Sequence, residues 1–130
     1  MSFHYIGLAE ALNLHEQTIA ATGGSFGVRD ETLVDSALAR PRAGFGGFEA
    51  YPDVFSKAGV LLEGLIKNHG FVDGNKRTAV VVTIIFLDRN GFRLIVERKE
   101  LVNFAVRIAE DKHDTEEITA WLKKHSKLMG

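Results

Sequence analysis

Apolar residues recur every three or four positions along most of the chain, which is the spacing of α-helices with one buried face. Glycines and prolines interrupt this pattern and divide it into segments. Helices are predicted at about residues 8–21, 31–40, 53–68, 74–90, 99–110 and 115–124, with a short extended piece at 92–96. The pattern therefore predicts an all-α fold, a compact bundle of about six helices.

Helix boundaries are supported by residues that favour helix ends. Asp30 and Asp53 are suitable N-caps, and Asp114 with Glu117 has the spacing of a capping box. The predicted helix at 74–90 is apolar on nearly all sides between Ala79 and Leu87, so we expect it at the centre of the bundle.

The connection at about residues 41–52 is long for a simple helix–helix link. It contains three glycines interleaved with the aromatic residues Phe45, Phe48 and Tyr51. Long connections of this kind often cover binding sites. We interpret it as a flap loop over the functional site, with the aromatic residues as anchors.

Composition narrows the class of protein. A chain of 130 residues with 45% apolar and 25% charged residues is typical of one globular domain, which we place at 1–130. The net charge of −1 argues against direct binding to nucleic acid, and the absence of cysteine excludes disulfides and thiolate metal sites. No apolar run is long enough to span a membrane, and no export signal is evident at the N-terminus, so we expect a cytoplasmic protein without membrane contact.

The candidate catalytic and ligand-binding residues lie between the third and fourth predicted helices, at residues 69–78. A helix N-terminus binds anions through its free N–H groups, and Gly74 allows a ligand to approach the backbone closely. Lys76 and Arg77 add two positive charges where the helix dipole alone disfavours them, so a bound polyphosphate would explain them. Asp73 is suited to hold Mg²⁺ together with phosphate oxygens, and His69 can accept a proton from a hydroxyl.

Each of these residues has a simpler structural interpretation when taken alone. A single histidine at a helix end is more often a packing residue, a Lys-Arg pair is usually solvated, and Phe71 is best explained as an anchor of the loop in the core. The loop is also not a Walker phosphate-binding loop, because only three residues separate Gly70 from Gly74 and Asn75 precedes the lysine.

The stretch His69-Gly70-Phe71-Val72-Asp73-Gly74-Asn75-Lys76-Arg77 resembles the signature of the Fic/Doc superfamily, in its Doc (death-on-curing) branch of toxin–antitoxin toxins. The resemblance extends to Ser36-Ala37-Leu38-Ala39-Arg40-Pro41, Tyr51-Pro52 and Gly64-Leu65-Ile66-Lys67-Asn68. It implies a helical bundle with a flap over the site. In it, His69 is the base, Asp73 holds Mg²⁺, and Asn75, Lys76 and Arg77 bind nucleotide phosphates with the helix N-terminus.

Three departures from the usual Fic signature bear on the reaction. The Fic signature, His-Pro-Phe-x-(Asp/Glu)-Gly-Asn-Gly-Arg-x-x-Arg, accompanies transfer of AMP, whereas this chain has Gly70, Lys76 and Val80 in place of proline, the second glycine and the last arginine. The Doc branch shares the lysine, and its implied activity is transfer of the γ-phosphate of ATP, or of another nucleoside triphosphate, to a protein hydroxyl. The implied target is a threonine of a translation factor, elongation factor Tu. AMP transfer remains the alternative.

The resemblance also bears on regulation. Members of the superfamily often carry an inhibitory motif, (Ser/Thr)-x-x-x-Glu-(Gly/Asn). The only glutamate here followed by glycine or asparagine is Glu63, and position 59 is Gly59. We therefore expect inhibition in trans by a cognate antitoxin that binds an exposed apolar groove.

Two other kinds of protein remain as alternatives: a catalytically silent regulator that binds nucleotide or a partner, and, less consistent with the charge, a ribosome or nucleic-acid binder. Most of the remaining candidate residues favour structural roles: His15 packing or hydrogen-bonding at a helix end, Trp121 in the core, Lys123 and Lys124 at the surface, and His4, His113 and His125 without metal-ligand spacing. Arg40 and Arg42 flank the predicted flap, and two interpretations stay open for them: contact with nucleotide or a partner, or a surface role.

Overall fold

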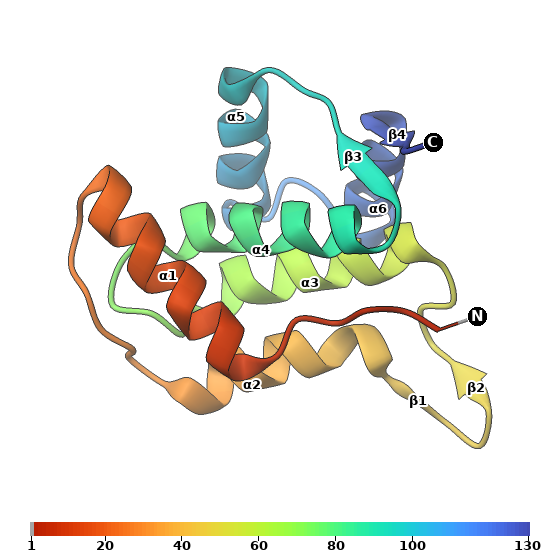
Figure 1. The fold of residues 1–130 in the computed structure, drawn as a ribbon, viewed down its shortest axis with the longest axis horizontal. Helices are drawn as coiled ribbons and strands as arrows, with labels where there is room; N and C mark the ends of the chain where they lie inside the picture. Colours follow the sequence, from red (N-terminus) through yellow and green to blue (C-terminus); the bar gives the residue numbers. More distant parts are fainter. Residues whose placement is uncertain (1) are drawn as a thin grey trace.

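The computed structural model describes residues 2–130 (Figure 1) and confirms the all-α class. Six α-helices account for most of these residues, and the short strands form only two-stranded sheets. No helix within residues 2–130 is long and apolar enough to cross a membrane. The elements in chain order are α1 (Leu8–Thr22), α2 (Glu31–Ala39), the 3₁₀ helix η1 (Arg40–Arg42), β1 (Gly44–Phe45), β2 (Phe48–Glu49), α3 (Val54–Asn68), α4 (Asn75–Arg89), β3 (Phe92–Leu94), α5 (Arg98–Ala109), α6 (Thr115–Lys124) and β4 (Ser126–Leu128).

The helices begin where the sequence places N-caps. The carboxylate of Asp30 accepts hydrogen bonds from the first turn of α2, and that of Asp53 does the same for α3. Asp114 and Glu117 form the predicted capping box at the start of α6. Side-chain oxygens at these positions satisfy N–H groups that a helix leaves unpaired.

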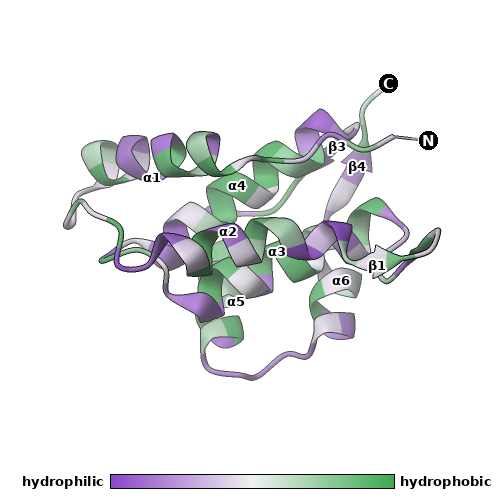
Figure 2. Ribbon diagram, turned by 90° about the horizontal axis from the view of Figure 1, so that it is seen from below, coloured by the Kyte–Doolittle hydropathy of each residue, from purple (hydrophilic) through white to green (hydrophobic). Residues whose placement is uncertain are grey.

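The most enclosed helix is α3, not α4 as expected. Twelve of the 15 residues of α3 are buried, and α2, η1, α4, α5 and α6 all pack against it. Only six of the 15 residues of α4 are buried, although hydrophobic stretches, green in Figure 2, are visible in both helices. The 74–90 helix does lie between other elements, packing against α1, α3, β3 and α5, but part of its apolar surface faces an open groove, described below.

The predicted flap at 41–52 is also misplaced. Its middle forms a hairpin, β1 paired with β2, at the start of α3, whereas the candidate site lies at the other end of that helix (Figure 1). A helix of 15 residues is about 22 Å long, so the hairpin cannot cover the site. Two of its three aromatic residues are not anchors either, since Phe45 is 85% and Phe48 66% exposed, whereas Tyr51 is partly buried.

The hairpin is instead fixed through Lys57, whose side chain is fully buried in α3. Its ammonium group donates to the carboxylate of Glu49 at 2.7 Å and to the carbonyl of Pro41 at 3.0 Å. It also lies 4.8 Å from the centre of the Phe3 ring. Burial alone would lower the pKa of Lys57, but the hydrogen bonds with Glu49 and Tyr5 outweigh it and raise the pKa.

The C-terminal part of the chain completes the bundle, with α5 and α6 packed against α3. β3 pairs with β4 in an antiparallel sheet, which the sequence pattern anticipated only as the extended piece at 92–96. The rings of Trp121 and Phe104 stack with centroids 3.8 Å apart, which agrees with the predicted packing role of Trp121.

Candidate functional site

The candidate site is built on the loop that joins α3 to α4, residues 69–74, which we call the site loop. α3 ends at His69, which adopts a left-handed conformation (φ 50°, ψ 48°) that is unfavourable for a residue with a side chain. Arg29 stabilises this ending: its Nε donates to the carbonyl of His69 at 2.7 Å and its Nη2 to that of Asn68 at 3.1 Å. The imidazole of His69 is exposed to solvent.

The centre of the site loop is anchored in the core. Phe71 is 3% exposed, which is the position that the sequence predicts for a loop anchor. The side chain of Asn75 closes the loop by accepting from the N–H of Phe71 and donating to its carbonyl, both at 3.0 Å. Asn75 therefore shapes the loop through its side chain, and its N–H remains available at the start of α4.

A segment between α1 and α2, residues 23–30, covers the site loop and takes the position that the sequence analysis assigned to 41–52. We call it the cover segment. Val28 and Phe71 form an antiparallel bridge, the N–H of Val72 donates to Gly27, and the N–H groups of Arg29 and Asp30 donate to the carbonyl of Gly70. The paired residues lie at least 40 positions apart in the chain, so local sequence patterns could not reveal this contact.

The N-terminus of α4 offers an anion site. Gly74 precedes the helix with φ 75°, and no side chain caps it. The N–H groups of Asn75, Lys76 and Arg77 have no acceptor among residues 2–130. Free N–H groups at the positive end of a helix dipole bind phosphate well.

The side chains of Lys76 and Arg77, beside this helix end, differ in whether they have partners within the protein. Arg77 is engaged: its Nη1 donates to the hydroxyl of Thr22 at 2.6 Å and to the carbonyl of Gly23 at 2.7 Å. Its Nη2 lies 3.6 Å from the carboxylate of Asp73. Lys76 is exposed and forms no hydrogen bond or ion pair within the part of the chain that the structure describes. Lys76 is therefore the cation most available to a ligand.

Asp73 is held in place by backbone N–H groups. Its Oδ2 accepts from Ser25 at 3.0 Å and its Oδ1 from Gly74 at 2.8 Å. These two hydrogen bonds, aided by the positive charge of Arg77, hold the pKa of the Asp73 carboxyl below its ordinary value. The approach is so close that a Cβ atom on Gly24 would lie 2.6 Å from Oδ2.

The carboxylate of Asp73 can hold the expected Mg²⁺ ion only if a bound ligand, such as a nucleotide, supplies further oxygen atoms. Two N–H groups occupy part of its hydrogen-bonding capacity, and the remaining lone pairs face a half-exposed surface. Residues 2–130 contain no group of three or more His, Asp or Glu side chains that could hold a metal ion by themselves. One carboxylate plus phosphate oxygens and water is a common way for proteins to bind Mg²⁺.

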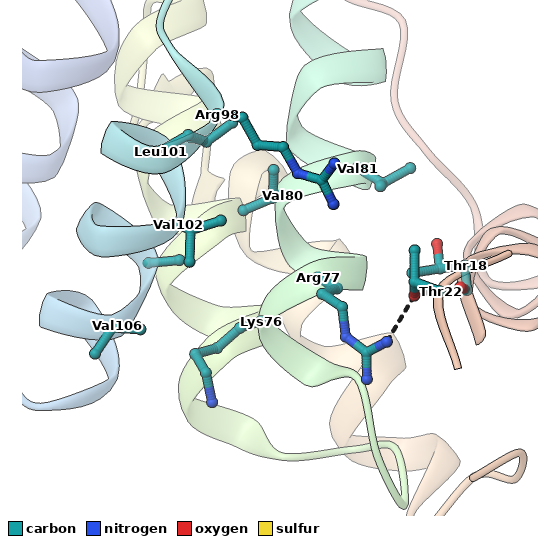
Figure 3. A pocket seen from close by; sticks show the side chains of 11 residues that line it. Thr18, Thr22, Lys76, Arg77, Val80, Val81, Arg98, Leu101, Val102 and Val106 are labelled. Carbon is teal, nitrogen blue, oxygen red and sulfur yellow. Dashed lines mark hydrogen bonds between the residues drawn. The ribbon is translucent and has the colours of Figure 1, made fainter. Parts of the chain in front are cut away.

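A groove of about 260 Å³ begins at the same end of α4 and runs between α1, α4 and α5 (Figure 3). Most of its lining is apolar, and Arg98 reaches from α5 toward α4. Lys76 and Arg77 belong both to this groove and to the anion site. The lining residues are Thr18, Thr22, Lys76, Arg77, Val80, Val81, Arg98, Leu101, Val102, Ala105 and Val106.

The other residues considered from the sequence have partners elsewhere. Arg40 pairs with Glu63 at 3.1 Å, and Arg42 lies over the ring of Tyr5. The ring of His125 hydrogen-bonds to the carbonyl of Trp121. In contrast, His15 packs and hydrogen-bonds as predicted, but its partners are residues of the site loop.

A comparison with known families agrees with the observed helical bundle. A model described as Fic/DOC family matches residues 5–87. The chain therefore belongs to the Fic/DOC family.

Two relatives place it in the Doc branch. The chain is 46% identical over 91 residues to Toxin Doc of Mycolicibacterium smegmatis, which covers 70% of this chain and 65% of that protein. It is 28% identical over 120 residues to Protein kinase doc of Escherichia phage P1, which covers 92% of this chain and 94% of that protein. The match thus spans slightly less than two thirds of the mycobacterial relative and nearly all of the phage protein.

Proposed function

We propose that this protein is the toxin of a toxin–antitoxin pair and that it transfers the γ-phosphate of a nucleoside triphosphate, such as ATP, to a hydroxyl group of a host protein. The observation that carries the proposal is the arrangement at the start of α4. Three N–H groups and the ammonium of Lys76, all without a partner among residues 2–130, lie within one turn of the ionised Asp73 and next to the exposed His69. The names of the two relatives, a toxin and a protein kinase, agree with this reaction.

In the proposed reaction, a ring nitrogen of His69 takes the proton of the acceptor hydroxyl as the hydroxyl oxygen bonds to the γ-phosphorus. The bond from that phosphorus to the β,γ-bridging oxygen breaks, and the nucleoside diphosphate leaves. Lys76 and the N–H groups of α4 bind the phosphate oxygens and offset the charge that develops on them. Asp73 would hold Mg²⁺, which when bound neutralises phosphate charge and aligns the phosphates.

The acceptor that we propose is a threonine of a translation factor, elongation factor Tu, so that phosphorylation stops translation. This proposal rests on the family resemblance. AMP transfer to the same kind of hydroxyl is the second candidate, because the site would require only that the α-phosphate rather than the γ-phosphate face the acceptor. A regulator without catalysis is the third.

One experiment separates these candidates. The purified protein is incubated with elongation factor Tu and with ATP labelled on either the γ-phosphate or the α-phosphate. We expect label on the factor from the γ position only. Label from the α position only would identify AMP transfer, and no label from either would favour the silent regulator.

Variants test the roles of the two central residues. His69→Ala should abolish transfer without changing the melting temperature. Its control is His4→Ala, which replaces an exposed histidine distant from His69 in the sequence. Lys76→Gly should weaken nucleotide binding or redirect the product. Lys99→Gly is a matched control because Lys99 is also the second residue of a helix, α5. Unchanged nucleotide affinity and product in Lys76→Gly would refute a phosphate role for Lys76.

We propose that the groove between α1, α4 and α5 binds the antitoxin. An apolar groove with basic residues at its rim suits an amphipathic helix that carries acidic residues. Because Lys76 and Arg77 line both the groove and the anion site, such a helix would compete with the nucleotide. Val102→Glu, in the groove, should weaken binding of the cognate antitoxin, whereas Ile95→Glu, exposed outside the groove, should not. Equal binding by both variants would refute this location.

A further inference from the structure

His15, a buried histidine in the middle of α1, contacts the site loop at two points. Its side chain is only 3% exposed. Its ring stacks on that of Phe71 with centroids 3.9 Å apart and planes 8° apart. Its Nε2 lies 2.7 Å from the carbonyl oxygen of Asp73. Because a carbonyl oxygen can only accept, Nε2 carries the proton and donates it in this hydrogen bond.

The carbonyl of Asp73 and the N–H of Gly74 belong to one peptide group. A peptide group is planar, and in the trans form its C=O and N–H point in opposite directions. The N–H of Gly74 donates to the Asp73 carboxylate at 2.8 Å. The hydrogen bond from His15 to the carbonyl therefore also sets the direction of the N–H that orients the carboxylate.

This peptide group needs an external restraint because a glycine follows it. Gly74 has φ 75°, and glycine tolerates both signs of φ at little cost, so the Asp73–Gly74 peptide could rotate without a steric penalty from a side chain. Rotation would direct the N–H away from the carboxylate and leave Asp73 with Ser25 as its remaining backbone donor. Within residues 2–130, His15 is the one group that donates to this carbonyl.

We propose that His15 is a positioning residue: it locks the Asp73–Gly74 peptide so that the Asp73 carboxylate keeps the orientation needed for the divalent cation. The part concerning the cation rests on the proposed function, whereas the lock itself is a property of the metal-free protein. His15 does not touch the nucleotide or the acceptor in this proposal. It acts through the backbone of the site loop.

A nearly isosteric pair of substitutions separates the hydrogen bond from simple packing. In His15→Gln the side-chain amide can donate at about the reach of Nε2, whereas His15→Met fills similar space and has no donor. His15→Phe is a second variant without a donor, and it keeps a flat ring to stack on Phe71. If one of the two variants without a donor fails to fold, the other still provides the comparison with His15→Gln.

The first measurement uses the metal-free protein. Hydrogen exchange at the Gly74 amide, followed by NMR, should become about tenfold faster in His15→Met and His15→Phe, because the amide loses the restraint on its peptide group. In His15→Gln the rate should remain close to the wild-type rate. Equal protection in all variants would overturn the lock, and so would equal loss in His15→Met and His15→Gln, since packing of the ring would then be the cause.

The second measurement is the affinity for Mn²⁺ in the presence of a non-hydrolysable ATP analogue, followed by electron paramagnetic resonance. Substitution of groups that orient metal ligands commonly weakens metal binding about 10- to 100-fold, so we expect a loss of at least tenfold in His15→Met and recovery in His15→Gln. Unchanged Mn²⁺ affinity in His15→Met would overturn the role of His15 toward the cation. If the wild-type protein binds no Mn²⁺ with the analogue, the proposed function fails, whereas the exchange of Gly74 still decides the lock.

Discussion

The guanidinium group of Arg29 binds the backbone of His69, with Nε 2.7 Å from the His69 carbonyl oxygen. Arg29 belongs to the cover segment, so this contact fixes the candidate base to a part of the chain 40 residues earlier. A positive charge at the end of α3 also interacts favourably with the helix dipole. The position of the His69 imidazole therefore depends on the cover segment as well as on the site loop.

Replacing Arg29 should reduce the rate of the proposed phosphate transfer more than the binding of nucleotide. Arg29→Ala frees the left-handed His69 backbone, and small misplacements of a reacting group can cost up to about 100-fold in rate. We expect kcat to fall at least tenfold with KM for ATP nearly unchanged, and Arg29→Lys to recover only part of the loss because an ammonium lacks the two-pronged geometry. Steady-state kinetics check this, with Arg93→Ala, at an exposed residue of β3, as control. A change in KM alone would contradict it.

The helical class and most helix boundaries could be predicted because they depend on local signals, such as apolar periodicity and the caps at Asp30, Asp53 and Asp114. The loop that covers the site could not, because glycines and aromatic residues occur in both 23–30 and 41–52. Which of them lies over the site depends on which end of α3 each one reaches. That is a property of tertiary packing.

The enclosure of α4 was overestimated for a related reason. Apolar residues on nearly all sides of a helix usually indicate burial, but Val80 and Val81 line the groove between α1, α4 and α5. Periodicity cannot distinguish a face that packs in the core from one that is left open. An apolar excess in a helix can therefore be a signal for a docking groove.

The candidate residues of the site could be proposed from the sequence because they are contiguous. The residues that hold them could not: Ser25 and His15 reach Asp73 across 48 and 58 residues. No local pattern marks a serine whose backbone N–H binds a distant carboxylate. For His15, the signal available was a lone histidine in an apolar helix, which fits core packing equally well.

The absence of proline at position 70 has a steric cause that mutation can test. A Cβ atom on Gly70 would lie 2.4 Å from a methyl carbon of Val34 and 3.1 Å from its backbone nitrogen. Gly70→Ala should therefore lower the free energy of unfolding by about 1–3 kcal/mol, measured by urea denaturation. Val34→Ala removes that methyl group, so the double variant should be more stable than the sum of the two single losses predicts. Strict additivity would contradict the steric cause.

The buried ammonium of Lys57 should contribute to stability and to the order of the β1–β2 hairpin. Lys57→Met leaves the Pro41 carbonyl and the Glu49 carboxylate without their donor, and we expect a loss of about 1–3 kcal/mol in the free energy of unfolding. Amides of the hairpin should also exchange faster, including that of Ala50, which donates to Ala43. Lys127→Met, at an exposed residue of β4, is the control. Equal stability of the two variants would show that the buried pair contributes nothing net.

Asp53 at the start of α3 should make stability depend on pH in the acid range. Burial alone would raise the pKa of Asp53, but hydrogen bonds from Ser56 and the N–H of Phe55 outweigh it and lower the pKa from the ordinary 3.8. Since the folded pKa lies below the unfolded one, this contribution is complete above the unfolded value and is lost as the pH falls through the folded value. The amide side chain in Asp53→Asn would still cap the helix but would not titrate. The free energy of unfolding of the wild type should therefore exceed that of this variant by less at about pH 3 than at about pH 6. Urea denaturation across that range checks this. Asp35→Asn, at an exposed residue of α2, is the control for replacing a carboxylate by an amide elsewhere in the protein. An advantage over Asp53→Asn that grows on acidification would contradict the lowered pKa.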